Sequence, residues 1–424
     1  AITPNIDRLA AESLDFVNAI GTSPVCTPAR AALLTGRFPT STGMFMNDIP
    51  LSPDEQSIGK AFKSGGYETA YIGKWHVDGH GRASYIPPER RQGFDYWKVL
   101  ECTHNYQNSE YYDGNDSTIK TWEGYDAFAQ TDDACEYIRQ HQKKPFFLTL
   151  SLGPPHFPHD NAPDEFQARF SPEDVQFSPN VVFDDPEFEA FTRKEAAGYY
   201  AHIAALDGCV AQVVDALKAT DLEENTILIF ASDHGEMMGS HGHTPYKKQI
   251  FWDESCRVPY LLRYPPMTSG QMGRKVTTPM GTVDIMPTLL SLCGLDIPDP
   301  VEGRDLSACV RDSVELDDHV ALYMSVSPFS GKNHDDPAYR AIRTRQHTYV
   351  HTSEQADYLF DDVEDPFQLK NLVDEPGAAE VRGQMEQALE QQLEKIDDPF
   401  EKQAYYLEKW GYEVNDTGEV PYSR

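Results

Sequence analysis

Apolar positions along residues 1–315 follow two alternating periods. Four short apolar runs bounded by polar residues, Gly or Pro predict β-strands at 68–72, 146–152, 226–231 and 259–264. Around them, apolar residues recur every three or four positions, which predicts helices at 4–14, 28–35, 54–64, 126–141, 194–219 and 283–292. Strands that alternate with helices in this way predict an α/β fold, in which a mostly parallel central sheet is sandwiched by helices.

The predicted helix 194–219 carries one continuous apolar stripe. Its members are spaced by four and three residues, namely Tyr199, Ile203, Leu206, Val210, Val213 and Leu217. Such spacing places all of them on one face of the helix, so we expect this face to be buried in the core.

Beyond residue 315 the pattern changes. Residues 339–350 alternate as a strand, 362–372 are rich in turn residues, and 377–396 form a polar, Glu- and Gln-rich helical segment. We therefore predict a large catalytic domain at 1–315 and a small C-terminal α+β subdomain with antiparallel strands at 316–424.

Two segments of the larger domain lack either period. Residues 100–125 are rich in Asn, Tyr, Asp and Ser, and residues 154–192 are rich in Pro, Asp and Phe. Long loops in a compact domain are often functional, so we predict that these surface excursions form substrate walls.

Composition narrows the choice of partners. The 424 residues include 36 basic and 68 acidic side chains, giving a net charge of -32. Such a surface repels nucleic acid and anionic membranes, and an anionic substrate would need a local basic site. No apolar run approaches the roughly 18 residues of a membrane span, and no signal-peptide pattern is found.

The seven cysteines are scattered without a C-x-x-C pair, which argues against a zinc knuckle or a thioredoxin-like centre. With Cys26 set aside, six cysteines remain. Disulfides are therefore permitted but not required, and the redox compartment stays open.

Four polar clusters follow predicted strands or short apolar runs. They are "GTSPVC" ending at Cys26, "GKWHVDG" with Lys74 and His76, "GPPHFP" with His156, and "SDHGE" with Asp233 and His234. Ligands of open α/β sheets bind beyond the carboxyl ends of the strands. Four such clusters from distant parts of the chain predict one site.

The segment "CTPAR" is suited to an anion. Thr27 is a good helix N-cap and Pro28 a good first helical residue, which would leave Cys26 at the helix N-terminus. Free N–H groups and the helix dipole favour an anion there, and Arg30 can reach back over the same turn. The alternative is a buried structural cysteine with Arg30 in a surface ion pair, but the other clusters favour a nucleophile.

These residues carry a family resemblance. "CTPARAALLTG" resembles the signature of the type I sulfatases, a family of the alkaline phosphatase superfamily. The segments that match in family order are "TPNIDRLAAES", "GKWH", "PPHFP", "SDHGEMMGSHG", "KKQIFWDESCRVPYLLRYP" and "YLFDDVEDPFQLKNL". The resemblance covers nearly the whole chain and implies an alkaline phosphatase-like fold and removal of sulfate from a sulfated carbohydrate.

The resemblance implies an unusual nucleophile. Cys26 would be oxidised to formylglycine by a maturation enzyme and hydrated, and one hydroxyl would attack sulfur. His156 would protonate the leaving alcohol, and His76 would take the proton of the second hydroxyl as sulfate leaves.

It also implies an anion site and a metal. Lys74 and Lys248 would bind sulfate oxygens, and Arg30 would hold the hydrated aldehyde. Asp233 and His234, together with the converted Cys26, would bind Ca²⁺, with Mg²⁺ or Mn²⁺ as other options. Family analogy places the enzyme in the periplasm or outside the cell.

Family members carry a strand that ends in two metal-binding aspartates upstream of the "TPNIDRL" helix, whereas this chain starts at Ala1. We therefore expect an N-terminally truncated sequence, two neighbouring strands with unpaired edges, and weakened metal binding and activity.

Three other functions remain open. A phosphonate monoester or phosphodiester hydrolase of the same superfamily can share C-x-P-x-R and an Asp-His metal pair. A non-catalytic sulfatase-fold binding protein would explain missing metal ligands. A zinc hydrolase built on His234, His241 and His243 is disfavoured, because a Gly-rich loop does not aim three rings at one point.

Overall fold

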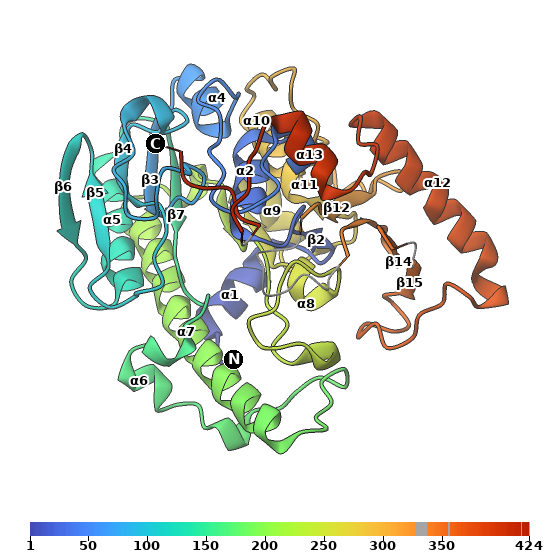
Figure 1. Ribbon diagram of the computed structural model, residues 1–424. Helices are drawn as coiled ribbons and strands as arrows, with labels where there is room; N and C mark the ends of the chain where they lie inside the picture. Colours follow the sequence, from blue (N-terminus) through green and yellow to red (C-terminus); the bar gives the residue numbers. More distant parts are fainter. Residues whose placement is uncertain (328–336, 355–356, 417, 424) are drawn as a thin grey trace.

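The computed structural model describes residues 1–327, 337–354, 357–416 and 418–423 (Figure 1). Two mixed sheets form the larger part of the molecule. One has the strand order β10-β1-β9-β8 and the other β6-β5-β4-β3-β7. Their bounds are β1 Leu14–Phe16, β3 Glu68–Lys74, β4 Tyr96–Leu100, β5 Glu110–Asp113, β6 Asp116–Thr121, β7 Phe146–Ser151, β8 Leu228–Ala231, β9 Tyr260–Arg263 and β10 Lys275–Val276.

All four predicted strands are present, with ends that differ from the prediction by at most two residues. Strand β3 runs parallel to β4 and β7, and β1 runs parallel to β10, whereas β9 is antiparallel to both β1 and β8. A further short pair joins β2, Ala19–Ile20, in parallel to β11, Met280–Gly281.

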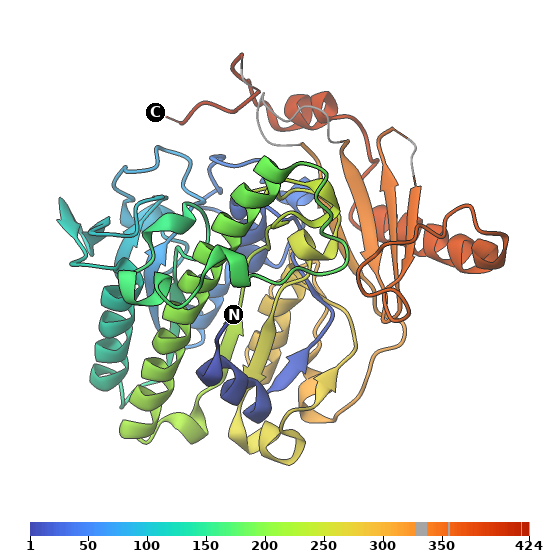
Figure 2. The ribbon, with the colours of Figure 1, turned by 90° about the horizontal axis from the view of Figure 1, so that it is seen from below.

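Helices cover both faces of these sheets (Figure 2). The longer ones are α1 Pro4–Glu12, α2 Cys26–Thr35, α4 Ile58–Ser64, α5 Asp126–Gln140, α7 Pro186–Ala219 and α10 Ile285–Leu292. Helices α5 and α7 pack against each other, while α2, α4 and α10 form a second group. The short helices are α3 Pro39–Thr42, α6 Asp164–Gln167, α8 Asp253–Cys256, α9 Pro265–Thr268 and α11 Ser307–Arg311.

Strands β7 and β8 each use one edge only. Among the described residues, β7 pairs with β3 alone and β8 with β9 alone. Leu148 of β7 and Leu228 of β8 nevertheless pack on the same apolar cluster between α5 and α7. Both strands remain half-exposed along most of their length, as an α/β sheet with an open seam requires.

The apolar stripe of α7 is less buried than its spacing predicts. Of its six members only Leu217 is buried, and the other five are half-buried. Val213 packs with the side chains of β7 and β8 beside the open seam. No described strand closes that seam, so the stripe lies at the margin of the core and small residues such as Ala201 and Ala205 are buried instead.

Two irregular predictions need correction. Residues 100–125 contain the β5–β6 hairpin, which extends the sheet antiparallel to β4 and is pinned by stacked rings of Tyr111 and Trp122. Residues 339–350 form parts of two strands and not one, because the chain turns at 344–346 with Thr344 N–H bonded to His347 O. The hydrophobic pattern did not predict the β5–β6 hairpin, because its strands are largely polar and face solvent.

The C-terminal sheet is wholly antiparallel, in the order β12-β13-β14-β15. Its strands are β12 Ala321–Ser325, β13 Tyr339–Arg343, β14 His347–Thr352 and β15 Asp357–Asp361, followed by α12 Ala379–Lys395 and α13 Gln403–Trp410. Arg343 ties this sheet to α8 through Asp253, at 2.7 Å. The chain then returns to the larger part, where Ser423 N–H donates to Gly79 O.

Within the described residues, no helix is both long and apolar enough to cross a membrane. None of the seven cysteines, all of which are described, forms a disulfide.

Candidate active site

The predicted site residues lie at the carboxyl ends of three strands and at the start of α2. Lys74 ends β3 and His76 follows it, His156 follows β7, and Asp233 and His234 follow β8. Cys26 opens α2 and contacts Lys74 and His234. The switch from strand to loop at one edge of the sheets therefore brings together residues far apart in sequence.

Helix α2 begins at Cys26, two residues earlier than the predicted start. Its N-cap is the extended residue Val25, which offers no side-chain cap, so the prediction of Thr27 as N-cap is wrong. The Thr27 hydroxyl instead donates to His76 O at 2.8 Å. A tertiary partner thus claims this hydroxyl, while Cys26 still lies at a helix N-terminus, 2% exposed.

Cationic groups surround the Cys26 thiol. Lys74 Nζ lies 3.5 Å from Cys26 Sγ. Burial alone would raise the pKa of this thiol, but the charges of Lys74, Lys248 and His234 outweigh it and hold the pKa well below its usual value. On a chain with a net charge of -32, this pocket is locally suited to an anion.

Arg30 is fixed by contacts on two sides. Its Nη1 donates to Lys74 O at 2.9 Å and to Ser151 Oγ at 2.8 Å, and its Nε lies 3.0 Å from Asp233 Oδ2. Ser151, the last residue of β7, was not identified from the sequence. Its hydroxyl donates in turn to Lys74 O at 2.8 Å, so it joins two of the predicted site residues.

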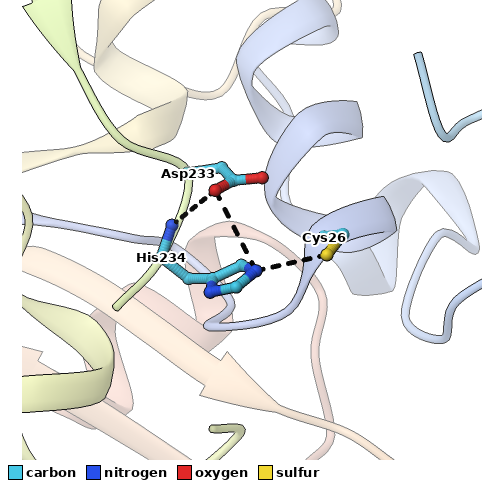
Figure 3. Close-up of side chains that lie close together, drawn as sticks. All are labelled: Cys26, Asp233 and His234. Atoms are coloured by element: carbon cyan, nitrogen blue, oxygen red, sulfur yellow. Dashed lines mark hydrogen bonds and ion pairs between the residues drawn. The ribbon is translucent and has the colours of Figure 1, made fainter. Parts of the chain in front are cut away.

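Cys26, Asp233 and His234 form the metal-ligand cluster found among the described residues (Figure 3). Their ligand atoms all lie within 4.8 Å of one another. His234 Nδ1 donates to Gly235 O at 2.9 Å, and Nε2 faces Cys26 Sγ at 3.2 Å, so Nε2 is the nitrogen that can bind a cation when the ring is neutral. The neighbouring His234 and Arg30 lower the pKa of the buried Asp233 carboxyl to about 2, against the effect of burial.

This donor set fits a cation only in part. Ca²⁺ takes six to eight oxygen ligands. The three side chains offer one carboxylate, one imidazole and the position of Cys26, so the remaining ligands must come from other groups, such as water or the substrate. The cluster could therefore supply only part of the ligands of a cation site.

His156 lies beside Lys248. The Nζ of Lys248 donates to His156 Nε2 at 2.6 Å, and His156 Nδ1 bonds Phe157 O at 2.9 Å. Burial and the charge of Lys248 lower the pKa of His156 to about 4. These contacts favour Lys248 over Lys247 as the lysine of the pocket.

Two carboxylates and a histidine lie behind Lys248. Glu236 Oε1 is 3.8 Å from Lys248 Nζ, and Glu236 Oε2 is 3.2 Å from His159 Nε2. His159 also bonds Glu195 of α7 at 2.9 Å. Glu236 stands inside the "SDHGE" motif and His159 directly follows "GPPHFP", but nothing in their spacing distinguished them from loop residues.

His76 has a carboxylate partner. Its Nε2 lies 3.1 Å from Asp48 Oδ1, and Asp48 Oδ2 accepts from Arg82 Nη2 at 3.0 Å. Burial would lower the pKa of His76, but Cys102 and Asp48 raise it well above its usual value. Asp48 stands in no motif and was not identified from the sequence; Cys102 was noted only as one of the scattered cysteines.

His241 and His243 do not join His234. The His241 ring stacks on Trp252 at 3.7 Å between centroids, and its Nε2 contacts Asn180 at 3.1 Å. Among the described residues, the ligand atoms of His234 lie together with those of Cys26 and Asp233 only. A three-histidine zinc site is therefore not formed.

Comparison with known proteins decides the family. The sulfatase family profile matches residues 1–295, and the profile of the C-terminal part of N-sulphoglucosamine sulphohydrolase matches residues 239–395. The chain belongs to the sulfatase family. It is an enzyme, a hydrolase of sulfuric esters, with the alkaline phosphatase-like fold that the motifs implied.

Individual relatives agree with this assignment. An ulvan-active sulfatase of Formosa agariphila is 45% identical over 412 residues, covering 97% of this chain and 80% of that protein. A crystal structure of the Bacteroides fragilis protein yidJ superposes with a TM-score of 0.84 at 30% identity, covering 96% of this sulfatase and 92% of that chain. A phosphonate monoester hydrolase of Silicibacter pomeroyi shares the fold, with a TM-score of 0.75 at 19% identity, covering 94% and 92%.

Proposed function

We propose that this sulfatase removes sulfate from a sulfated carbohydrate, with a formylglycine made from Cys26 and a bound divalent cation, Ca²⁺ first among the candidates. The observation that carries the proposal is the pocket around the buried Cys26, where the charges of Lys74 and Lys248 act on the nucleophile position. A sulfate ester is a compact anion that such a pocket can bind and desolvate.

The conversion of Cys26 would supply a hydrated aldehyde as nucleophile. Asp233 and His234 would hold the cation, which would supply Lewis-acid chemistry at that position. Arg30 contributes a fixed positive charge beside Asp233, because Ser151 and the carbonyl of Lys74 restrain its guanidinium. A rigid charge costs little reorganisation when the sulfuryl group moves.

His76 and His156 act as the general base and the general acid. His76 takes a proton at the nucleophile, and Asp48 beside it favours the charged ring. His156 donates a proton to the leaving alcohol. Its pKa of about 4 reflects burial and Lys248, so an anionic ester bound to Lys248 offsets that charge and favours the protonated ring.

A row of aromatic rings suits a sugar substrate. The rings of His156 and Phe157 lie 4.4 Å apart between centroids, Phe157 and Tyr246 5.2 Å, and Tyr246 and Phe191 5.7 Å. Phe191 is 38% exposed, so the row extends from the pocket to the surface. Aromatic faces pack against the apolar faces of sugar rings, and the ulvan-active sulfatase at 45% identity supports a polysaccharide substrate.

Two other functions remain weaker. The phosphonate monoester hydrolase similarity, at 19% identity, reflects the fold alone. A non-catalytic binding protein does not need a buried Cys26 beside Lys74 and His234, nor a buried His76 paired with Asp48.

The experiment is to express the chain with a formylglycine-maturation enzyme and to analyse the peptide containing Cys26 by mass spectrometry. We expect the aldehyde, together with hydrolysis of 4-nitrophenyl sulfate that exceeds hydrolysis of an aryl phosphonate in kcat/KM. An unmodified thiol in a soluble, folded protein would overturn the formylglycine proposal. A higher kcat/KM on the phosphonate would favour the second enzyme class.

Substrate and place of action need separate tests. A screen over sulfated mono- and oligosaccharides should single out a sugar with a kcat/KM above that of the aryl sulfate. Action in the periplasm or outside the cell predicts activity in those fractions of the native organism, and activity confined to the cytoplasm would contradict it.

A further inference from the structure

The contact between His76 and Asp48 is built by three separate parts of the chain. His76 Nε2 lies 3.1 Å from Asp48 Oδ1, and the His76 side chain is 2% exposed. A carboxylate can only accept, so Nε2 must carry a hydrogen in every charge state of the ring. The atom that gains or loses a proton is therefore Nδ1. It is buried without a well-aligned hydrogen bond among the described residues, and the ring also has the thiols of Cys102 and Cys26 as neighbours.

Thr27 locks the two residues relative to Cys26. Its hydroxyl donates to His76 O at 2.8 Å and accepts from Asp48 N–H at 3.3 Å. The Thr27 N–H donates in turn to Asn47 Oδ1 at 3.0 Å. Because Thr27 directly follows Cys26 in α2, the first turn of this helix fixes both members of the pair.

The backbones of the two loops meet at close range. His76 has φ 61° and Asp48 has φ 65°, a left-handed conformation that non-glycine residues adopt at some cost. Gly79, with φ 64°, makes the approach possible, since a Cβ there would lie 2.8 Å from Asp48 O and 2.5 Å from Pro50 N. Two strained residues and one required glycine are thus used to form a single side-chain contact.

Arg82 determines how Asp48 is oriented. Its Nη2 donates to Asp48 Oδ2 at 3.0 Å, which directs the other carboxylate oxygen to His76. Burial would raise the pKa of Asp48, but hydrogen bonds from His76 and Arg82 lower it, so this carboxylate stays charged.

We infer that Asp48 is a positioning residue of the sulfatase reaction, which fixes the ring of His76 with hydrogen on Nε2 and makes Nδ1 the atom that exchanges a proton in the pocket. Arg82 and Thr27 hold Asp48 in that role. The inference rests on the proposed function for the base role of His76, whereas the hydrogen position on the ring is independent of it.

The test uses an isosteric change, Asp48→Asn. Arg82 donates to one atom of residue 48, so the carbonyl of the introduced amide would face Arg82 and its NH₂ would face His76 Nε2. The neutral ring would then carry its hydrogen on Nδ1, the wrong atom for accepting a proton. We expect kcat on 4-nitrophenyl sulfate to fall about 10²- to 10⁴-fold with a small change in KM.

A second change provides a rescue. In Asp48→Asn/Arg82→Leu the amide is free to turn its oxygen to His76, so we expect at least a tenfold recovery of kcat over Asp48→Asn. The matched control is Asp357→Asn, which removes a carboxylate from His351 in the C-terminal sheet, at 2.5 Å, and should leave kcat unchanged.

The hydrogen position itself is read by ¹⁵N NMR of the histidine-labelled protein with Cys26 unconverted, the His76 signals being assigned by their loss in His76→Gln. We expect the neutral ring to be protonated on Nε2 in the wild type and on Nδ1 in Asp48→Asn. The same tautomer in both proteins, or a kcat loss without rescue, would overturn the inference. Expected NMR spectra without any sulfatase activity would overturn the proposed function alone.

Discussion

The catalytic pocket has two sides that differ in the charge beside their histidines. The His76 side consists of His76, Asp48 and Arg82, and the His156 side of His156 and Lys248. A carboxylate lies 3.1 Å from the first ring and an ammonium group 2.6 Å from the second. Both rings are largely buried, so burial alone would lower both pKa values.

The residues beside each ring decide in which direction its pKa is shifted. Cys102 and Asp48 raise the pKa of His76, whereas Lys248 adds to burial and lowers the pKa of His156 to about 4. The pKa of the first ring is therefore shifted upward and that of the second ring downward. Two histidines at the ends of neighbouring strands thus acquire different proton affinities from residues outside their own motifs.

Removing the ammonium group of Lys248 from the His156 side should have the largest effect on activity. In Lys248→Met we expect kcat/KM on 4-nitrophenyl sulfate to fall about 10³-fold, because the proposed sulfate contact and the partner of His156 are lost. The pKa of His156 should rise from about 4 toward 6.5, so that its charged form persists to higher pH.

Steady-state kinetics and histidine NMR over pH 4–8 measure both effects. Lys63→Met, which removes a surface ion pair with Asp95 at 2.6 Å, is the control. A loss of less than tenfold would mean that Lys248 does not contact the sulfate.

The buried carboxyl of Asp126, which has no positively charged partner among the described residues, tests how far burial alone shifts a pKa. Burial raises the pKa of Asp126 to about 7, and no ion pair to it occurs among the described residues. The folded pKa exceeds the unfolded one, so the stability contribution is complete below pH 4 and is lost as pH rises through 7. We expect Asp126→Asn to stabilise the fold by roughly 2–4 kcal/mol at pH 8 and by little at pH 4.

Thermal or urea unfolding at the two pH values checks this prediction. The introduced amide can still accept a hydrogen bond from Ser109 Oγ, which donates to Asp126 Oδ2 at 2.8 Å. Equal stability changes at both pH values would show that the carboxyl ionises normally in the folded state.

The smallest expected effect concerns the aromatic row that leaves the His156 side. Phe191→Ala should raise KM for a sulfated oligosaccharide about 3-fold and leave 4-nitrophenyl sulfate unchanged, since the ring is remote from the reacting group. Phe188→Ala, one helical turn away beside Phe183, is the control. An equal change on both substrates would indicate a disturbed pocket and not a sugar contact.

Much of the site followed from local sequence. The strand ends and the motifs identified Cys26, Arg30, Lys74, His76, His156, Asp233, His234 and Lys248, and the structure brings members of all four clusters into contact. The α/β pattern succeeded for the same reason, because apolar periodicity reports which backbone segments are buried.

Other features depended on tertiary contacts. The sequence of "CTPAR" favours Thr27 as a helix cap, but in the fold its hydroxyl is claimed by His76 O. The α7 stripe is only half-buried because β7 and β8 leave a seam open. Periodicity shows which face of a helix is apolar, but not whether another element covers it.

The sequence by itself determined the family and singled out Cys26 and the basic residues around it, because these residues stand in contiguous motifs at strand ends. Only the tertiary structure decided which partner each histidine receives. Asp48 lies 28 residues from His76, and Lys248 lies 92 residues from His156. Proton affinity depends on charges within a few ångströms, and that proximity is a property of the fold.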